Sequence, residues 1–210
     1  SGVAVRHTTP LDLKTAGLVG AGTQGYYQLL FAAQARKLDN IVVYNRTFAK
    51  TLDFCARLKK DLPGIRIEVV NSVDELLKAV DLVITATPAS SPVLPDDETL
   101  LAGKSYIGIG SYKPDMREFP QALYCLTEQI LVDTRHSLEE SGDLITPLEK
   151  HWIKSKDVIN FADYLNGESG LPEPGETTIF KSVGMALFDL VVCEHIYRLA
   201  REKGLGVELK

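Results

Sequence analysis

Short apolar runs alternate with helical patterns through the first two thirds of the chain. Between the runs, apolar side chains recur every three or four residues, as at Tyr26, Leu29 and Ala33. This alternation predicts βαβ crossovers and a doubly wound parallel sheet, an α/β fold. The runs are nearly continuous, as in strands that helices cover on both faces. The predicted strands are 15–19, 41–44, 65–70, 82–85, 104–110 and 130–132.

The pattern changes after about residue 145. Short helical pieces lead to a turn-rich stretch, Asn166 to Gly175, and then to a short strand, Thr177 to Phe180. A long helix is predicted from about Met185 to Lys203. Its apolar residues spread over more than one side, so we expect it to pack on the main domain, on a second small domain or on a partner subunit.

Composition narrows the class of protein. The chain has 210 residues, 45% of them hydrophobic, and a formal net charge of −5. This length allows one sizeable core, and the acidic balance argues against nucleic acid as a partner. The sequence also lacks an apolar stretch that could span a membrane. Three cysteines, Cys55, Cys125 and Cys193, are expected to be reduced, buried thiols of a cytoplasmic protein.

Residues 20–25 have the spacing G-x-G-x-x-G, after a predicted strand and at the start of a predicted helix. In that context the motif is typical of a Rossmann dinucleotide site. Gly20 permits the tight turn, Gly22 lets a diphosphate approach the backbone, and Gly25 lets the helix pack closely on the strand. The helix N-terminus supplies free N–H groups for the phosphates.

The end of the second strand bears on the choice of cofactor. NAD sites usually place a carboxylate about 20 residues after the glycines to bind the ribose 2′-hydroxyl. This chain has Asn45, Arg46 and Thr47 there, and Arg46 can pair with a 2′-phosphate. We therefore expect a preference for NADP(H), with NAD(H) as the alternative. Arg46 as a solvated surface residue and Thr47 as a mere helix cap remain open.

Two further loops are expected beside the cofactor, since ligands of open α/β sheets lie outside the carboxyl ends of the strands. They follow the fourth strand at residues 85–88 and the fifth at residues 108–111. No spacing typical of metal ligands occurs among the four histidines, so no metal is expected. Lys181 could contact a carboxylate or a phosphate, or form a surface salt bridge.

Three segments resemble the ornithine cyclodeaminase/μ-crystallin family, and the resemblance covers nearly the whole chain. They are residues 110–118 (GSYKPDMRE), 140–143 (ESGD) and 177–186 (TTIFKSVGMA). The resemblance implies an NAD(P)-dependent enzyme that acts on small amino acids, imino acids or ketimines, and a homodimer when full length. It also implies cofactor contacts for Gly22, Thr23, Gln24, Asn45, Arg46, Thr47, Thr87, Pro88, Ser111, Ser182, Val183 and Gly184.

Two departures from the family pattern matter. Ornithine cyclodeaminases carry a catalytic Asp where this chain has Tyr112, so the motif looks closer to the μ-crystallin-like reductases. Family members also have an N-terminal domain, which binds the substrate carboxylate and forms much of the dimer interface. We expect this chain to be a fragment or a natural truncation. No catalytic residue is assigned, because the candidates for the proton donor lie in that domain.

These observations predict three parts and one leading function. Residues 1–14 are a lead-in segment, 15–145 the Rossmann domain, and 146–210 a C-terminal segment of a second, incomplete domain. The expected function is NADP(H)-dependent reduction of C=N bonds, as an imine or ketimine reductase or an amino-acid dehydrogenase. The alternatives are an NAD-dependent ornithine cyclodeaminase and a non-catalytic protein that binds NADPH or a small ligand.

Overall fold

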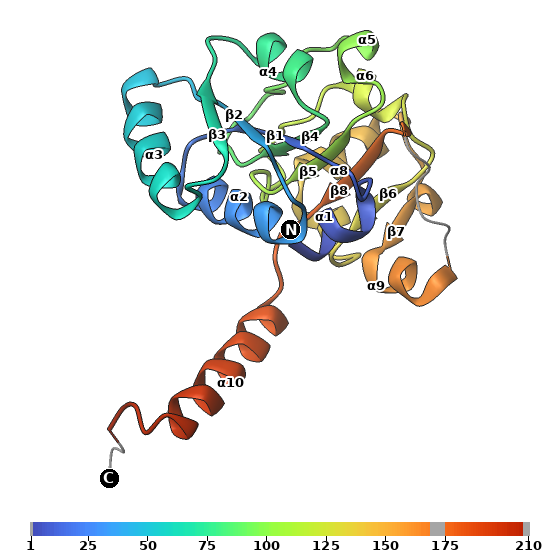
Figure 1. The fold of residues 1–210 in the computed structure, drawn as a ribbon. Helices are drawn as coiled ribbons and strands as arrows, with labels where there is room; N and C mark the ends of the chain where they lie inside the picture. Colours follow the sequence, from blue (N-terminus) through green and yellow to red (C-terminus); the bar gives the residue numbers. More distant parts are fainter. Residues whose placement is uncertain (1, 169–174, 208–210) are drawn as a thin grey trace.

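A parallel β-sheet forms the centre of the molecule (Figure 1). The structure is a computed structural model that describes residues 2–168 and 175–207. Within these residues the sheet has eight strands in the order β3-β2-β1-β4-β5-β8-β6-β7. Their bounds are β1 Thr15–Val19, β2 Asn40–Tyr44, β3 Arg66–Val69, β4 Leu82–Thr85, β5 Ser105–Gly108, β6 Ile130–Val132, β7 Val158–Asn160 and β8 Thr178–Lys181.

Helices cover both faces of the sheet. Figure 1 shows α1 and α2 on one side and α4, α5 and α6 on the other. The helices are α1 Gly2–Thr8, α2 Thr23–Ala35, α3 Phe48–Asp61, α4 Val73–Ala79, α5 Glu98–Leu101, α6 Gln121–Tyr124, α7 Ser137–Glu140, α8 Gly142–Glu149, α9 Phe161–Asp163 and α10 Ala186–Glu202, with short turns η1 Ser155–Asp157 and η2 Tyr164–Glu168. The predicted doubly wound α/β class is confirmed.

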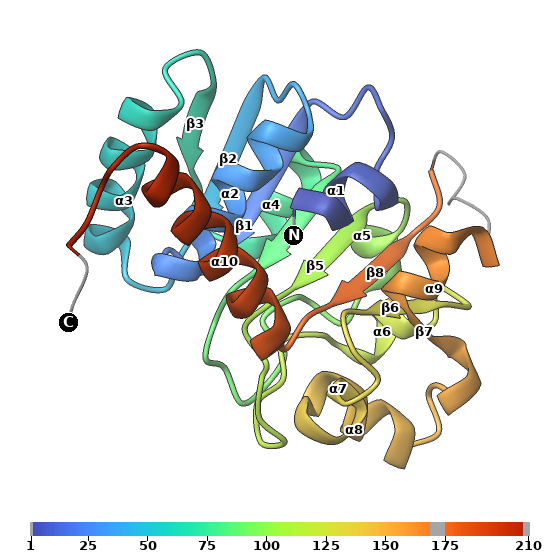
Figure 2. The ribbon, with the colours of Figure 1, turned by 90° about the horizontal axis from the view of Figure 1, so that it is seen from below.

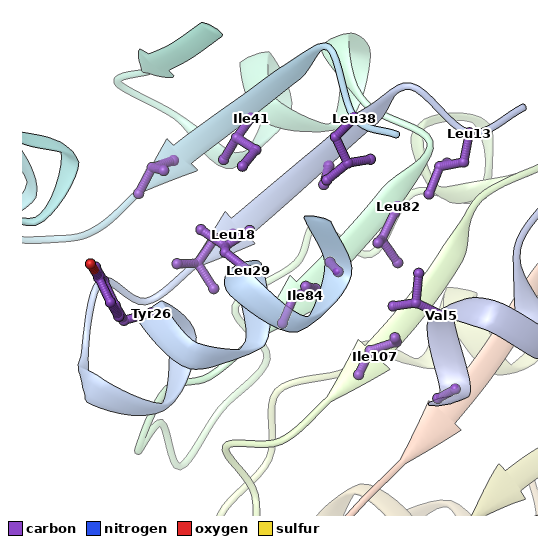
Figure 3. Packing of buried hydrophobic residues seen from close by; sticks show 14 of the residues in the cluster. Val5, Leu13, Leu18, Tyr26, Leu29, Leu38, Ile41, Leu82, Ile84 and Ile107 are labelled. Carbon is purple, nitrogen blue, oxygen red and sulfur yellow. The ribbon is translucent and has the colours of Figure 1, made fainter. Parts of the chain in front are cut away.

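Each central strand feeds two separate cores, which explains its continuous apolar run. In β4, Leu82 and Ile84 join the cluster on the α1–α2 side, and Val83 joins the cluster on the α4 side. Successive side chains of a strand point to opposite faces, so a strand covered on both faces needs apolar residues at every position. Figure 3 shows the first cluster, where Leu29 of α2 packs over Leu18 of β1.

The sheet continues beyond the boundary that the sequence suggests near residue 145. β8 lies between β5 and β6 and is parallel to both, and β7 forms the edge beside β6. Residues 158–160 and 178–181 therefore belong to the same sheet as the Rossmann strands. The sequence did not predict β7, because Val158–Asn160 has only two apolar residues, whereas the equally short β6 is an unbroken apolar run.

The lead-in segment is part of the folded body. Ala4 and Val5 of α1 are buried in the α1–α2 cluster. The buried guanidinium of Arg36, just after α2, donates hydrogen bonds to the carbonyl oxygens of Arg6, Thr9 and Pro10. These contacts fix α1 against the Rossmann strands.

Helix α10 projects away from the body in Figure 1, and in the view of Figure 2, from below, it lies in front of the body. None of its residues is buried, and Leu190 and Tyr197 are 65% and 61% exposed. We expected this helix to pack on the main domain, on a second small domain or on a partner subunit. In the described residues it does not pack on the main domain. The helix starts directly after Gly184 and Met185, and Gly184 has a left-handed backbone with φ +86°.

The expectation that all three cysteines are buried needs correction. Cys55 is buried, but Cys125 and Cys193 are exposed, and all three thiols are free. Cys125 caps the short helix α6 and Cys193 lies on the projecting α10, so neither reaches a core. Of the predicted turn-rich stretch, residues 169–174 lie outside the described residues. In the described part of the chain, no helix has the length and apolar character needed to cross a membrane.

Candidate functional site

Four loops from separate parts of the chain meet at one edge of the sheet. Val19 of β1 pairs with Thr85 of β4, Thr85 with Gly108 of β5, and Gly108 with Lys181 of β8. The strands are parallel, so the segments that follow these residues all leave from the carboxyl edge. The structure thus brings together the predicted cofactor contacts after β1, β4, β5 and β8, with those after β2 beside β1.

The glycine turn has the geometry that its sequence predicts. Gly20 has φ +106°, and a Cβ there would lie 2.7 Å from the carbonyl oxygen of Ala86. A Cβ on Gly25 would lie 2.5 Å from the carbonyl oxygen of Gly20 and 2.9 Å from the methyl groups of Leu18. A Cβ on Gly22 would meet no atom within 4 Å. Gly20 and Gly25 therefore allow close packing, and Gly22 leaves open space.

That open space lies at the N-terminus of α2. Gly22 is the N-cap residue and provides no side chain to bind the first amides. Thr23 and Gln24, which begin the helix, are exposed. The first N–H groups of a helix lack intrahelical partners, and together with the helix dipole they attract anions. These features fit the diphosphate of a dinucleotide.

The loop after β2 is tied to the glycine turn through Asn45. Its Oδ1 accepts a hydrogen bond from the N–H of Ala21 at 3.3 Å, and its Nδ2 donates to the carbonyl oxygen of Thr47 at 3.0 Å. Arg46 and Thr47 are exposed, and Arg46 forms no ion pair within the described ranges. Thr47 stands at the N-cap of α3, but its side chain makes no capping hydrogen bond, so the predicted capping is wrong.

A buried carboxylate joins the ends of β4 and β5. Glu118 is fully buried and accepts hydrogen bonds from the hydroxyl of Thr85 (2.9 Å), the N–H and hydroxyl of Thr87 (2.7 and 2.8 Å) and the N–H of Gly110 (2.7 Å). Pro88, in the same β4 loop, is exposed. Burial raises the pKa of Glu118, while the Lys181 ammonium and the Thr87 donors act to lower it.

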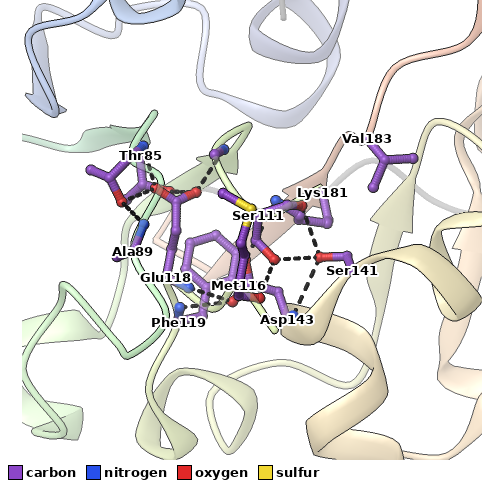
Figure 4. Close-up of polar contacts among 12 residues, drawn as sticks. Thr85, Ala89, Ser111, Met116, Glu118, Phe119, Ser141, Asp143, Lys181 and Val183 are labelled. Atoms are coloured by element: carbon purple, nitrogen blue, oxygen red, sulfur yellow. Dashed lines mark hydrogen bonds and ion pairs between the residues drawn. The ribbon is translucent and has the colours of Figure 1, made fainter. Parts of the chain in front are cut away.

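Ser111, predicted as a cofactor contact, has its side chain inside the loop after β5. It is fully buried, and its hydroxyl lies 2.5 Å from the carbonyl oxygen of Met116 and 2.8 Å from the hydroxyl of Ser141 (Figure 4). The side chain therefore braces the loop after β5 and does not point to an open cofactor site. The next residue, Tyr112, is 52% exposed.

A buried ion pair lies beneath this loop. The Nζ of Lys181 is 3.4 Å from Oδ2 of Asp143, and both side chains are almost completely excluded from solvent. The other oxygen of Asp143 accepts hydrogen bonds from the N–H groups of Glu118 (2.7 Å) and Phe119 (2.9 Å). The sequence left three alternatives for Lys181: a carboxylate, a phosphate or a surface salt bridge. Lys181 contacts the carboxylate of Asp143, and because this pair is buried it is not a surface salt bridge.

The segment after β8 is held by a second carboxylate. Asp133, at the end of β6, accepts hydrogen bonds from the hydroxyl of Ser182 (2.6 Å) and from the N–H groups of Val183 (3.4 Å) and Gly184 (2.8 Å). The sequence did not identify Asp133, and it included Glu118 and Asp143 only as members of the motifs that resemble the family. The only sequence signal for a structural role of Glu118 and Asp143 is that both lie in segments with glycine or proline.

One hollow in the described residues lies away from this site. It has a volume of about 730 Å³ and is lined by Ala102, Gly103 and Thr178, at the amino ends of β5 and β8. This is the edge opposite the glycine turn. No group of three or more His, Cys, Asp or Glu side chains in the described chain is arranged to hold a metal ion.

Comparison with known proteins identifies one family and relatives that are named as reductases. The sequence model of the ornithine cyclodeaminase/mu-crystallin family matches residues 1–204. A Delta(1)-pyrroline-2-carboxylate reductase of Bacillus cereus is 31% identical over 215 residues, which cover 100% of this chain and 65% of the relative. The ketimine reductase mu-crystallin of Mus musculus is 29% identical over 199 residues, which cover 94% of this chain and 59% of the relative.

The fold is also similar to that of solved enzymes. The structure of Thermococcus litoralis Delta(1)-pyrroline-2-carboxylate reductase in complex with NADH and L-proline matches with a TM-score of 0.92 and 30% identity. The match covers 99% of this chain and 64% of that one. The iminosuccinate reductase of Paracoccus denitrificans in complex with NAD+ has a TM-score of 0.87 at 24% identity, covers 100% of this chain and 63% of that one, and supports the fold alone. The chain thus spans slightly less than two thirds of these relatives' lengths.

Proposed function

Because this chain belongs to the ornithine cyclodeaminase/mu-crystallin family, we propose that it binds a nicotinamide dinucleotide and serves the reduction of C=N bonds in small imino acids. The observation that carries the proposal is the open space over Gly22 at the N-terminus of α2. The similar reductases, two of them named for pyrroline-2-carboxylate, indicate the substrate class. We also propose a homodimer for the full-length protein.

The dinucleotide would lie across the carboxyl edge of the sheet. Its diphosphate would be held by the turn from Gly20 to Gly25, with the N–H groups of Thr23 and Gln24 as donors. The N–H of Gly22 donates to the carbonyl oxygen of Gly20 at 3.0 Å, so Gly22 would contribute the open space and not a donor. The remaining contacts proposed for the adenosine end are Asn45, Arg46 and Thr47, and those for the nicotinamide end are Thr87, Pro88, Ser182, Val183 and Gly184 with the backbone of Ser111.

The bound cofactor supplies the hydride, and this chain supplies position and exclusion of water. The loops after β4 and β5 are fixed by Glu118, and the segment after β8 is fixed by Asp133. Loops that are fixed before binding lose little conformational freedom when the cofactor enters. These contacts would therefore hold one face of the reaction site in a defined shape.

A direct assay tests the activity. The full-length protein is mixed with a five- or six-membered cyclic imino acid and NADPH or NADH, and cofactor oxidation is followed by absorbance. We expect oxidation that depends on the imino acid. Tight cofactor binding without oxidation would favour the non-catalytic alternative, and proline formation from ornithine without net cofactor use would favour a cyclodeaminase. Either result would contradict the proposed reductase.

We further propose that NADP(H) is preferred over NAD(H). The loop after β2 carries an exposed guanidinium at Arg46 and no carboxylate that would repel a 2′-phosphate. Arg46→Ala should weaken NADPH binding about 10- to 100-fold, as expected for loss of a charged hydrogen bond, and leave NADH binding nearly unchanged.

Calorimetry with both cofactors measures this difference. Arg66→Ala is the matched control, because Arg66 is also exposed but begins β3 at the amino edge of the sheet. If Arg46→Ala and Arg66→Ala change NADPH affinity equally, then the loss follows from the change in the protein's net charge. Arg46 would then not be the cause of a preference for NADP(H).

A further inference from the structure

The Glu118 carboxylate is placed between the loops that follow β4 and β5 (Figure 4). It accepts hydrogen bonds in the described residues from the hydroxyls of Thr85 and Thr87 and from the N–H groups of Thr87 and Gly110. Each carboxylate oxygen thus accepts from one backbone N–H, a group that can only donate, whereas a hydroxyl is both a donor and an acceptor. The arrangement therefore suits an ionised carboxylate that pulls both loops toward itself.

The two loops are in close contact with each other and with the glycine turn. A Cβ on Gly110 would lie 2.1 Å from the carbonyl oxygen of Thr87, and a Cβ on Gly20 would lie 2.8 Å from Cγ2 of Thr87. A displacement of Thr87 thus changes its distance from the loop after β5, while the glycine turn keeps its own hydrogen bond from the N–H of Gly20 to the carbonyl oxygen of Tyr44. Glu118 holds Thr87 at two points, one on the backbone and one on the side chain.

The backbone of Glu118 is itself held by a second buried carboxylate, that of Asp143. Asp143 accepts a hydrogen bond from the backbone N–H of Glu118 and pairs with Lys181, the last residue of β8. The residue after Lys181 begins the segment held by Asp133. The Glu118 carboxylate and the Asp143–Lys181 pair therefore link the carboxyl ends of β4, β5 and β8 in one buried network.

We propose that Glu118 is a positioning residue for the nicotinamide half of the dinucleotide, acting through Thr87 and Gly110. The proposal rests on the proposed function, because it assumes that a dinucleotide lies across this edge. The adenosine half depends on a different set of contacts, since the glycine turn is fixed independently by the hydrogen bond from the N–H of Gly20 to the carbonyl oxygen of Tyr44.

Glu118→Gln is the discriminating variant. A glutamine side chain has one acceptor oxygen and one N–H₂ donor. In place of Glu118, its N–H₂ group would face the backbone N–H of either Thr87 or Gly110, each of which now points at a carboxylate oxygen. Two donors cannot bond to each other, so the loop after β4 or the loop after β5 would have to move away. The displaced loop would lie at the nicotinamide end, and the turn from Gly20 to Gly25 would keep its shape.

The test compares the affinities for NADH and for ADP, which contains the adenosine and diphosphate half alone. Glu118→Gln should weaken NADH binding by about tenfold or more and change ADP binding by less than about twofold. Tyr106→Phe is the matched control. It removes a buried hydrogen bond from the Tyr106 hydroxyl, on strand β5, to the carbonyl oxygen of Leu101, which lies away from the carboxyl edge. The control should leave both affinities within about twofold of wild type.

Equal losses for NADH and ADP, or no loss for either, would overturn the positioning role alone. A wild-type protein that binds neither compound would overturn the proposed function as well. Amide hydrogen exchange on the wild type provides a second test that does not depend on the variant's folding. Protection of the Thr87 and Gly110 amides should increase with NADH and stay constant with ADP, and equal protection with both would count against the proposal.

Discussion

Three glycines within one turn have different physical tasks at the residue scale. Gly20 has a left-handed backbone, Gly25 allows a close helix–strand contact, and Gly22 leaves an open space. The sequence spacing predicted the turn at Gly20 and the close packing at Gly25, because both depend on residues that are near neighbours along the chain. This local origin explains why the glycine turn could be identified without a structure, while the approach of a diphosphate to Gly22 stays a prediction.

The same substitution at two of these glycines should have different effects. Gly25→Ala forces a methyl group to within 2.5 Å of the Gly20 carbonyl oxygen and should lower the free energy of unfolding by about 1–3 kcal/mol. Gly22→Ala meets no atom, so it should cost less than about 1 kcal/mol yet weaken NADH binding by about tenfold or more. Urea unfolding and calorimetry measure the two quantities. Wild-type NADH affinity in Gly22→Ala would show that no diphosphate approaches this position.

The buried lysine is a second feature of individual residues. Lys181→Met would leave Asp143 charged, buried and without its cation, and should lower the free energy of unfolding by about 3–5 kcal/mol. Lys14→Met is the matched control, because Lys14 forms an exposed pair with Asp39 at 3.9 Å and should cost less than about 1 kcal/mol. Similar costs for the two variants in urea unfolding would contradict the burial of the Lys181–Asp143 pair.

The sequence did not reveal the carboxylates that shape the site. Glu118 and Asp143 are 25 residues apart, and Asp133 and Ser182 are 49 residues apart. Their contacts exist only after β5, β6 and β8 are assembled side by side. A carboxylate in a sequence is normally expected at the surface, so burial and partners become visible only in the fold.

At the scale of elements, the junction between β8 and α10 is held by a carboxylate from a distant part of the chain. Asp133 binds three donors in the segment Ser182–Gly184, and α10 starts two residues after it. The sequence predicted β8 and α10 to within two residues, because their apolar patterns are local. It did not predict that Asp133, on another strand, fixes the turn between them.

Loss of this contact should loosen the junction. Asp133→Asn replaces one acceptor oxygen by an N–H₂ group that faces donors, so the Gly184 amide should exchange its hydrogen about tenfold faster or more. Hydrogen exchange followed by mass spectrometry or NMR measures the rate. Glu194→Gln, which removes an exposed charge paired with Arg198 on α10, should leave the rate unchanged. An unchanged rate in Asp133→Asn would show that the carboxylate does not hold the turn.

At the scale of the whole molecule, parallel strands collect distant loops at one edge. The alternation of apolar runs predicted a parallel sheet and therefore a carboxyl edge with a ligand site. It could not predict that β8 enters between β5 and β6, since strand order depends on packing between elements far apart in sequence. That insertion places the Ser182–Gly184 segment next to the β5 loop. The exposed apolar surface of α10 is likewise a property of the assembled molecule.

The most direct measurement is a crystal structure of the chain soaked with NADH. The central claim is that a dinucleotide lies across the carboxyl edge, with its diphosphate over Gly22 and on the amides of Thr23 and Gln24. We predict electron density for the diphosphate within hydrogen-bond distance of these N–H groups, and for the nicotinamide beside the loops that Glu118 joins. An empty glycine turn at saturating NADH, or density in the hollow at the amino ends of β5 and β8, would contradict the account.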